Sequence, residues 1–341
     1  MIEILFDFGL FLAKAITITV CLIFVVGFTI SALFRGKTEK KDQIQIKSIN
    51  NKYKRFAAVL ERETLPKHQF KQKAKKQKVE LKQKKKKRKK AVEVKKRVFV
   101  IDFVGDIRAS AVESLREEIT AVLTTATPQD EVLVRLESGG GMVHTYGLAA
   151  SQLSRIKSGN VPLTVAVDKI AASGGYLMAT VADRILAAPF AILGSIGVIA
   201  QLPNFNRFLK QHNIDYEQIV AGHEKRSLTM FGENTDDDRE RLKLELNETH
   251  ELFKEFVGQS RKQLDLEKIS SGKHWYGTTA LSLNLIDEIV TSDDYLAAQS
   301  ESADLFEISF MIKKSFMQRM PFSVKGFVDT FFKLGQSNRN G

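Results

Sequence analysis

Residues 162–183 read PLTVAVDKIAASGGYLMATVAD and contain a strand signal, a turn signal and a helix signal in immediate succession. The apolar, β-branched run 163–167 is typical of a buried strand in a mostly parallel sheet. Gly174 and Gly175 permit a tight turn, and 176–183 has the composition of a buried helix. The stretch therefore predicts an α/β fold in which Ser173 lies between a strand and a helix.

Ser173 has two interpretations at this position. Serine is a common N-cap, because its hydroxyl accepts a hydrogen bond from the first turn of a helix. A serine at a helix start also gains free N–H groups and the positive end of the helix dipole, which suit a nucleophile. The segment alone favours neither interpretation.

A second strand signal, 132–137, runs into Ser138-Gly139-Gly140-Gly141 and then into a helical pattern. A glycine turn can direct backbone N–H groups toward a developing oxyanion, as acyl transfer requires. It can equally serve only as a tight strand-to-helix connection.

The third segment is 216–229, which we expect to form a short strand followed by a charged turn that contains Lys225. A lysine in such a turn is usually solvated. In a dry cleft, however, desolvation lowers the pKa of a lysine, and the neutral amine can then take a proton from a serine.

Together these segments resemble the signal peptide peptidase A family of membrane-bound serine proteases, and most closely its SohB branch. The resemblance covers residues 98–298. It is carried, in order, by Ser138-Gly139-Gly140-Gly141, by Ala172-Ser173-Gly174-Gly175-Tyr176, by Gly194-Ser195-Ile196-Gly197, by Gly222-His223-Glu224-Lys225, and by Gly272 to Gly277 with Ala280 to Glu288. Gly139 stands where the family has a proline.

The resemblance implies a Clp/crotonase-type fold of stacked ββα units and a homo-oligomeric ring. It also implies a serine endopeptidase that acts on peptides, such as signal-peptide remnants or membrane proteins, without metal or cofactor. Ser173 is then the nucleophile and Lys225 the general base. The amide of Gly174, with that of Gly140 or Gly141, is expected to hold the oxyanion.

Three alternatives stay open. His144 or His223 can be proposed as base in a Ser-His-Asp scheme, although their order along the chain does not match that scheme. A crotonase-like enzyme that binds acyl-CoA would also use glycine turns, but it needs no serine nucleophile. A non-catalytic membrane scaffold would need neither residue. A Cys/His metal cluster is excluded because Cys21 is the sole cysteine.

The net charge of +12 is concentrated between residues 67 and 97, where seventeen Lys and Arg stand against two Glu. The rest of the chain is close to neutral. This tract cannot bury apolar area, so we interpret it as a solvated linker that is attracted to anionic lipid. Nucleic-acid binding is disfavoured because no aromatic residues are interleaved for base stacking between residues 71 and 97.

The run 15–34 contains no charged residue and is as long as a bilayer core when helical. We interpret it as an uncleaved transmembrane helix. Positive charges from Arg35 onward favour a cytoplasmic body, whereas the family favours the periplasmic face of a bacterial inner membrane, so the side stays open.

The expected domains are therefore a membrane anchor at 1–36, a basic linker at 37–97, a peptidase domain at 98–298 and an extension at 299–341. Within the peptidase domain, the alternation of strand signals (98–103, 131–137, 162–167, 184–188) with helix signals (110–123, 205–211, 236–267) predicts an α/β pattern. Ser110 is expected to cap the first of these helices, and Leu252 and Phe253 are expected on the buried side of the last.

Overall fold

The computed structural model describes residues 2–35, 43–73, 75–76, 79, 95–222 and 228–311. The chain divides into two units, one of residues 1–43 with 311–341 and the other of residues 44–310. The expected extension 299–341 lies outside the described residues beyond Met311.

The described part of the first unit is the helix α1 (Ile2–Arg35). It contains the run 15–34 that the sequence analysis assigned to a transmembrane helix. Among the described residues, no helix combines the length and the apolar character needed to cross a membrane.

The second unit alternates strands and helices along the sequence, as predicted from the periodicity. The strands are β1 (Gln43–Ser48), β2 (Arg97–Gly105), β3 (Glu131–Ser138), β4 (Leu163–Val167), β5 (Ile170–Ala172), β6 (Arg184–Ala187), β7 (Ile192–Gly194), β8 (His274–Tyr276), β9 (Glu288–Ile289) and β10 (Asp304–Met311). The helices are α2 (Ile49–Thr64), α4 (Val112–Leu123), α5 (Val143–Ser158), α6 (Gly174–Thr180), α7 (Asn206–Gln211), α8 (Asp236–Ser260), α9 (Leu266–Ile269), α10 (Gly277–Ser282) and α11 (Ser292–Ser302).

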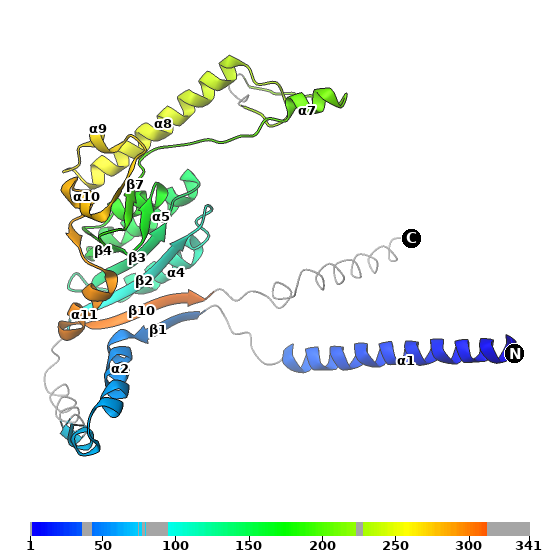
Figure 1. Ribbon diagram of the computed structural model, residues 1–341, viewed down its shortest axis with the longest axis horizontal. Coiled ribbons are helices and arrows are strands. Elements are labelled where there is room, and N and C mark those ends of the chain that lie inside the picture. Colours follow the sequence, from blue (N-terminus) through cyan, green and yellow to red (C-terminus); the bar gives the residue numbers. More distant parts are fainter. Residues whose placement is uncertain are drawn as a thin grey trace. The chain divides into compact units, whose positions relative to one another are not determined.

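The strands form a single sheet with the order β1-β10-β2-β3-β4-β6-β9, part of which is visible in Figure 1. From β10 to β9 the pairs are parallel. A branch leaves this path where Ser138 at the end of β3 pairs with Ala171 of β5, and it continues through β7 to the antiparallel β8. The branch carries β5 and the residue that follows it to the glycine turn after β3.

Alternation along the strands divides the apolar residues between the two faces of the sheet. Ile101, Phe103 and Val134 point to one face, where α4, α5 and α6 cover a large core. Val100 and Leu133 point to the other, where α11 and the start of α2 cover a smaller core. A sheet covered on both faces explains the nearly continuous apolar runs in β2, β3 and β4.

Residues 43–64, which the sequence analysis placed in the basic linker, form β1, which is the edge strand next to β10, and α2, whose start packs on the smaller core. Asn50 fixes this segment, because its side-chain amide donates to the carbonyls of Ser300 and Ala303 at 3.1 and 3.0 Å. Its side-chain oxygen accepts the Leu305 N–H at 2.7 Å. The part of the chain from 80 to 94, where the lysines are densest, lies outside the described residues.

Several local expectations were wrong. Ser110 does not cap α4, because the helix follows Ala111 and the Ser110 hydroxyl donates to the Asp106 carboxylate. Residues 216–220 form no strand. The helix expected over 236–267 ends at Ser260, and Leu252 on it is 66% exposed, while Phe253 is half-buried as expected.

Asp130 ties the starts of β2 and β3 together. Its carboxylate accepts from Arg97 Nε at 2.9 Å, from Arg97 Nη2 at 2.6 Å and from the Thr127 N–H and hydroxyl, both at 2.8 Å. Burial of the side chain opposes ionisation, but the hydrogen bonds from Arg97 and Thr127 outweigh it and lower the pKa of Asp130 to about 2.

Asp130→Asn is therefore expected to lower the free energy of unfolding by about 2 kcal/mol at pH 7. A lowered carboxylate pKa stabilises the fold above the pKa of the unfolded state, and this stabilisation is lost as the pH falls through the folded-state pKa. The difference from the wild type should thus shrink between pH 4 and pH 2. Chemical denaturation at pH 7 and pH 3 measures it.

The control is Asp215→Asn, which removes an exposed carboxylate and should change little at either pH. An Asp130→Asn penalty that is equally large at pH 7 and pH 3 would contradict the assignment of the stabilisation to the ionised carboxylate.

Candidate active site

Ser173 occupies a sharp junction between β5 and α6, with φ 51° and ψ −122°. A positive φ costs a non-glycine residue about 1–3 kcal/mol and persists only when the surroundings hold it. Here the Ser173 N–H donates to the Gly194 carbonyl at 2.8 Å, and its own carbonyl accepts the Leu177 N–H at 2.9 Å. The backbone of Ser173 is thus fixed from both sides.

The side chain of Ser173 is not used to cap the helix. No cap hydrogen bond forms, although Ser173 is the residue before α6. Within the described part of the chain its hydroxyl has no hydrogen-bond partner, and the residue is only half-buried. Ser173 therefore occupies the N-cap position without a side-chain capping bond, and its role as nucleophile stays a prediction. A strained backbone with an unengaged hydroxyl is a common arrangement for a nucleophile.

The glycine turn after β3 lies directly against Ser173. A Cβ added at Gly140 would lie 2.7 Å from the Ser173 Cβ and 2.8 Å from the Gly174 nitrogen. Gly140 also has φ +89°. A side chain at this position would therefore meet both steric contact and backbone strain, so glycine is required for the two segments to approach.

The amides around Ser173 are not equivalent. The Gly140 N–H donates to Ser138 Oγ at 3.1 Å, and the Met142 N–H donates to the Ile107 carbonyl at 2.9 Å. The Gly141 and Gly174 amides have no acceptor among the described residues. The sequence left Gly140 and Gly141 as equal candidates for an oxyanion donor, whereas in the structure Gly140 is engaged and Gly141 is free.

A cavity of about 320 Å³ opens beside Ser173 and is bounded by α5, α6 and α8. Its wall is mostly apolar and includes Leu177, Val198, Phe253 and Phe256, together with Gly141, Gly147 and Gly174. The cavity therefore suits an apolar side chain placed next to the Ser173 hydroxyl.

Lys225 and His223 lie outside the described residues, so the structure does not place the proposed base or one of its histidine alternatives. The other alternative, His144, is exposed near the start of α5 and does not line the cavity. The pairing of Ser173 with Lys225 remains a prediction.

Ser195 lies near the site, and the sequence analysis named it only as part of a longer motif. It follows Gly194, whose carbonyl holds Ser173, and it too has a positive φ of 53°. The segment that contains it is tied to the body by the Ser195 N–H, which donates to the Lys273 carbonyl at 2.8 Å. A second strained serine so close to the first could have been found only from backbone angles.

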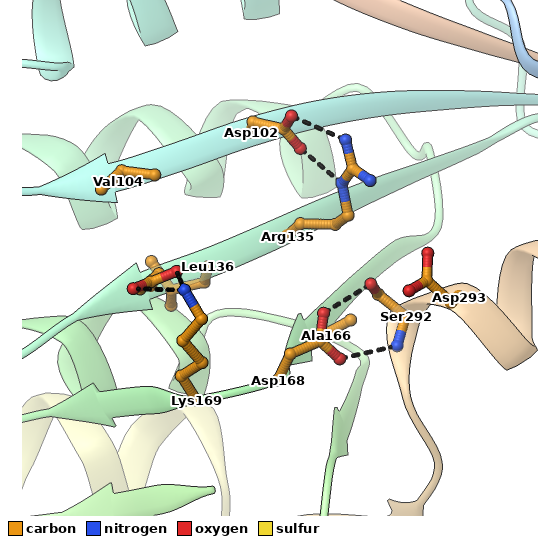
Figure 2. A pocket seen from close by; sticks show the side chains of 10 residues that line it. Asp102, Val104, Arg135, Leu136, Ala166, Asp168, Lys169, Ser292 and Asp293 are labelled. Atoms are coloured by element: carbon orange, nitrogen blue, oxygen red, sulfur yellow. Dashed lines mark hydrogen bonds and ion pairs between the residues drawn. The ribbon is translucent and has the colours of Figure 1, made fainter.

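A separate cleft of about 340 Å³ lies beside β2, β3 and α11 (Figure 2). Its two cations are each paired with a carboxylate: Arg135 donates to Asp102 at 2.5 and 2.6 Å, and Lys169 donates to Glu137 at 2.9 Å. Asp168 accepts from the Ser292 hydroxyl at 2.6 Å. None of its lining residues lines the cavity at Ser173. We interpret these pairs as structural.

Comparison with known proteins shows which family the chain resembles. The model "Peptidase family S49 N-terminal" matches residues 3–153, and the model "Peptidase family S49" matches residues 155–305. The catalytic domain of the ClpP protease from Plasmodium falciparum is a distant structural neighbour, with a TM-score of 0.37 and 11% identity over 57% of this chain and 85% of that chain.

Several curated relatives carry the name "Probable protease SohB". The protein from Haemophilus influenzae is 46% identical over 325 residues, which cover 93% of this chain and 92% of the relative. The protein from Buchnera aphidicola subsp. Acyrthosiphon pisum is 54% identical over 230 residues, which cover 67% and 68%. Such identity along nearly the whole length of a relative, together with the two family matches, shows that the chain belongs to peptidase family S49 and is a serine-type peptidase.

Proposed function

We propose that the protein is an endopeptidase in which Ser173 is the nucleophile and Lys225 is the general base. The observation that carries the proposal is the unengaged hydroxyl of Ser173, held on a strained backbone between two free amides and an apolar cavity. Those are the nucleophile, the oxyanion site and the substrate pocket of acyl transfer.

In the proposed reaction the neutral Lys225 amine takes the Ser173 proton as the serine oxygen bonds to the substrate carbonyl carbon. The Gly141 and Gly174 amides donate to the oxyanion that forms. The C–N bond then breaks, and the Lys225 ammonium returns the proton to the departing amine. A water molecule, activated by Lys225, finally hydrolyses the acyl-enzyme and frees Ser173.

Ser173→Ala and Lys225→Ala are each expected to lower kcat by at least about 10³-fold, because the nucleophile and its base act as one unit. Cleavage of unfolded protein and of apolar peptides by the full chain in detergent measures this. Labelling by a fluorophosphonate should disappear in Ser173→Ala and slow in Lys225→Ala.

The matched controls are Ser158→Ala and Lys169→Ala. Ser158 donates to the Ser154 carbonyl within α5, and Lys169 pairs with Glu137 in the charged cleft, so both variants should keep wild-type activity. Full peptide cleavage by a folded Ser173→Ala variant would contradict the assignment of Ser173 as the nucleophile.

We infer further that the substrate presents an apolar side chain to the cavity beside Ser173, as the apolar segments of membrane proteins and signal peptides do. Gly147, within α5, lines this cavity, and a Cβ added there would meet nothing within 4 Å. This position therefore allows the pocket to be filled without disturbing the core.

Gly147→Leu is expected to raise KM about tenfold or more for peptides with Leu or Phe at the cleavage site, because its side chain occupies the cavity. Peptides with Ala at that site should be cleaved with little change. The matched control Gly147→Ala should raise the free energy of unfolding by about 0.5–1 kcal/mol and leave this selectivity intact. Equal effects of Gly147→Leu on both peptides would contradict the pocket assignment.

The proposal includes the finer architecture expected from the sequence, a Clp/crotonase-type fold that assembles into a homo-oligomeric ring. The branch through β5 and β7, which leaves the main sheet at Ser138, supports the stacked arrangement. A mass measurement of the detergent-solubilised chain tests the assembly.

We also propose attachment to a bacterial inner membrane through the uncharged run 15–34, with the Lys-rich tract near anionic lipid. This part rests on the sequence alone. The full chain is expected to stay in the membrane fraction after an alkaline carbonate wash, whereas a chain lacking residues 1–36 should be released. Release of the full chain by the wash would exclude a spanning anchor.

A further inference from the structure

Beneath the glycine turn, Ser138 and Tyr146 form a buried polar pair that the proposed reaction does not use. Ser138 is 2% exposed and Tyr146 is fully buried. Their hydroxyl oxygens lie 2.6 Å apart. Ser138 Oγ also accepts the Gly140 N–H at 3.1 Å, and the Tyr146 hydroxyl also contacts the Asp106 carbonyl oxygen at 2.7 Å.

The direction of these hydrogen bonds follows from the groups at the two ends. The Asp106 carbonyl can only accept, so the Tyr146 proton is donated to it. Tyr146 must then accept the Ser138 proton, and Ser138 in turn accepts the Gly140 N–H. Burial raises the pKa of Tyr146, so the phenol keeps its proton at neutral pH. A chain of three bonds therefore runs from Gly140 through Ser138 and Tyr146 to Asp106.

Glycines make room for this pair on three sides. A Cβ at Gly105 would lie 2.4 Å from the Tyr146 hydroxyl, and a Cβ at Gly174 would lie 2.4 Å from Tyr146 Cγ. A Cβ at Gly175 would lie 2.5 Å from the Ser138 carbonyl oxygen. The Tyr146 ring thus packs under the backbone that carries the Gly174 amide, while its hydroxyl supports the turn that carries the Gly141 amide.

The residues on either side of Gly141 are both anchored to the loop after β2. Gly140 is connected to Asp106 through the hydrogen-bond chain, and the Met142 N–H donates directly to the Ile107 carbonyl at 2.9 Å. A Cβ at Gly141 would lie 2.1 Å from that carbonyl oxygen, so the turn lies tightly against the loop. The unengaged amide of Gly141 is therefore held between two fixed neighbours.

We propose that Tyr146 and Ser138 are positioning residues for the peptidase, which fix the Gly141 amide relative to the Gly174 amide so that both face one oxyanion. This inference rests on the proposed function, because it needs Ser173 to form a tetrahedral intermediate at those amides. Preorganised donors of this kind act mainly on the transition state, so their loss lowers kcat more than it raises KM.

The test compares Tyr146→Phe with Tyr176→Phe in the full chain. Tyr176 is a matched control, because it is also fully buried and its hydroxyl donates to a single carbonyl, that of Leu285, at 2.9 Å. Tyr146→Phe is expected to lower kcat about 10- to 100-fold with KM within about twofold. Tyr176→Phe should lose comparable stability and keep kcat within about twofold.

Two further measurements separate positioning from a general loss of order. A peptide aldehyde adds to the serine oxygen and places an oxyanion at the two amides, whereas the corresponding peptide alcohol cannot. Tyr146→Phe should lower the affinity for the aldehyde by the same factor as it lowers kcat, and it should leave the affinity for the alcohol unchanged. Ser138→Ala is a smaller change that serves if Tyr146→Phe does not fold, and it should lower kcat and the aldehyde affinity in the same way. The double variant should lose no more kcat than the worse single variant, because both residues belong to one hydrogen-bond chain.

The proposal is overturned if Tyr146→Phe and Tyr176→Phe lower kcat equally, or if Tyr146→Phe lowers the affinities for the aldehyde and the alcohol together. It is also overturned if the kcat losses of Tyr146→Phe and Ser138→Ala add in the double variant. Failure of the proposed function gives a different result. In that case Ser173→Ala remains active and the aldehyde binds it as it binds the wild type, whatever the Tyr146 variant does.

Discussion

The close contact between the glycine turn after β3 and the β5–α6 junction is the constraint on which the site depends. It follows from the sheet, because Ser138 pairs with Ala171 and so brings two distant stretches of backbone together. The contact leaves no room for a side chain at Gly140. Ser173 takes a positive φ at the same place, and the bond from its N–H to Gly194 fixes it there. The backbone at the carboxyl ends of neighbouring parallel strands thus determines where the site lies.

The charged cleft and the cavity at Ser173 have similar volumes, so volume alone does not identify a site. In the charged cleft, Arg135 is paired with Asp102 and Lys169 with Glu137, so each of these cations already has a partner. The apolar cavity contains an unengaged hydroxyl and borders two amides without acceptors. An unsatisfied polar group beside apolar surface is costly, and such groups are kept where a ligand completes them.

The sequence predicted the parts that depend on local pattern. The strands β2, β3, β4 and β6 were expected because each is a short apolar run, and Ser173 was found because small residues follow it. The sequence pattern did not predict the backbone geometry of Ser173 or which glycine amide is free. The φ of Ser173 depends on a bond to Gly194, and the difference between Gly140 and Gly141 depends on the Ser138 hydroxyl. The expected strand at 216–220 did not form, and its short stretch of Tyr216, Ile219 and Val220 has no neighbouring strand among the described residues.

The same dependence on tertiary contacts explains why the sequence does not distinguish Tyr146 from the other apolar residues of its helix. In the helical pattern of α5 it is one apolar position among Ala149, Leu153 and Ile156, and its ring does pack in the core. Only the fold shows that its hydroxyl reaches the Asp106 carbonyl under the glycine turn. Core packing fixes the position of the Tyr146 ring and therefore of its hydroxyl, and the hydroxyl supports the glycine turn after β3. Stability and site geometry therefore depend on one side chain, so a change there affects both, whereas Tyr176, equally buried, serves the core alone.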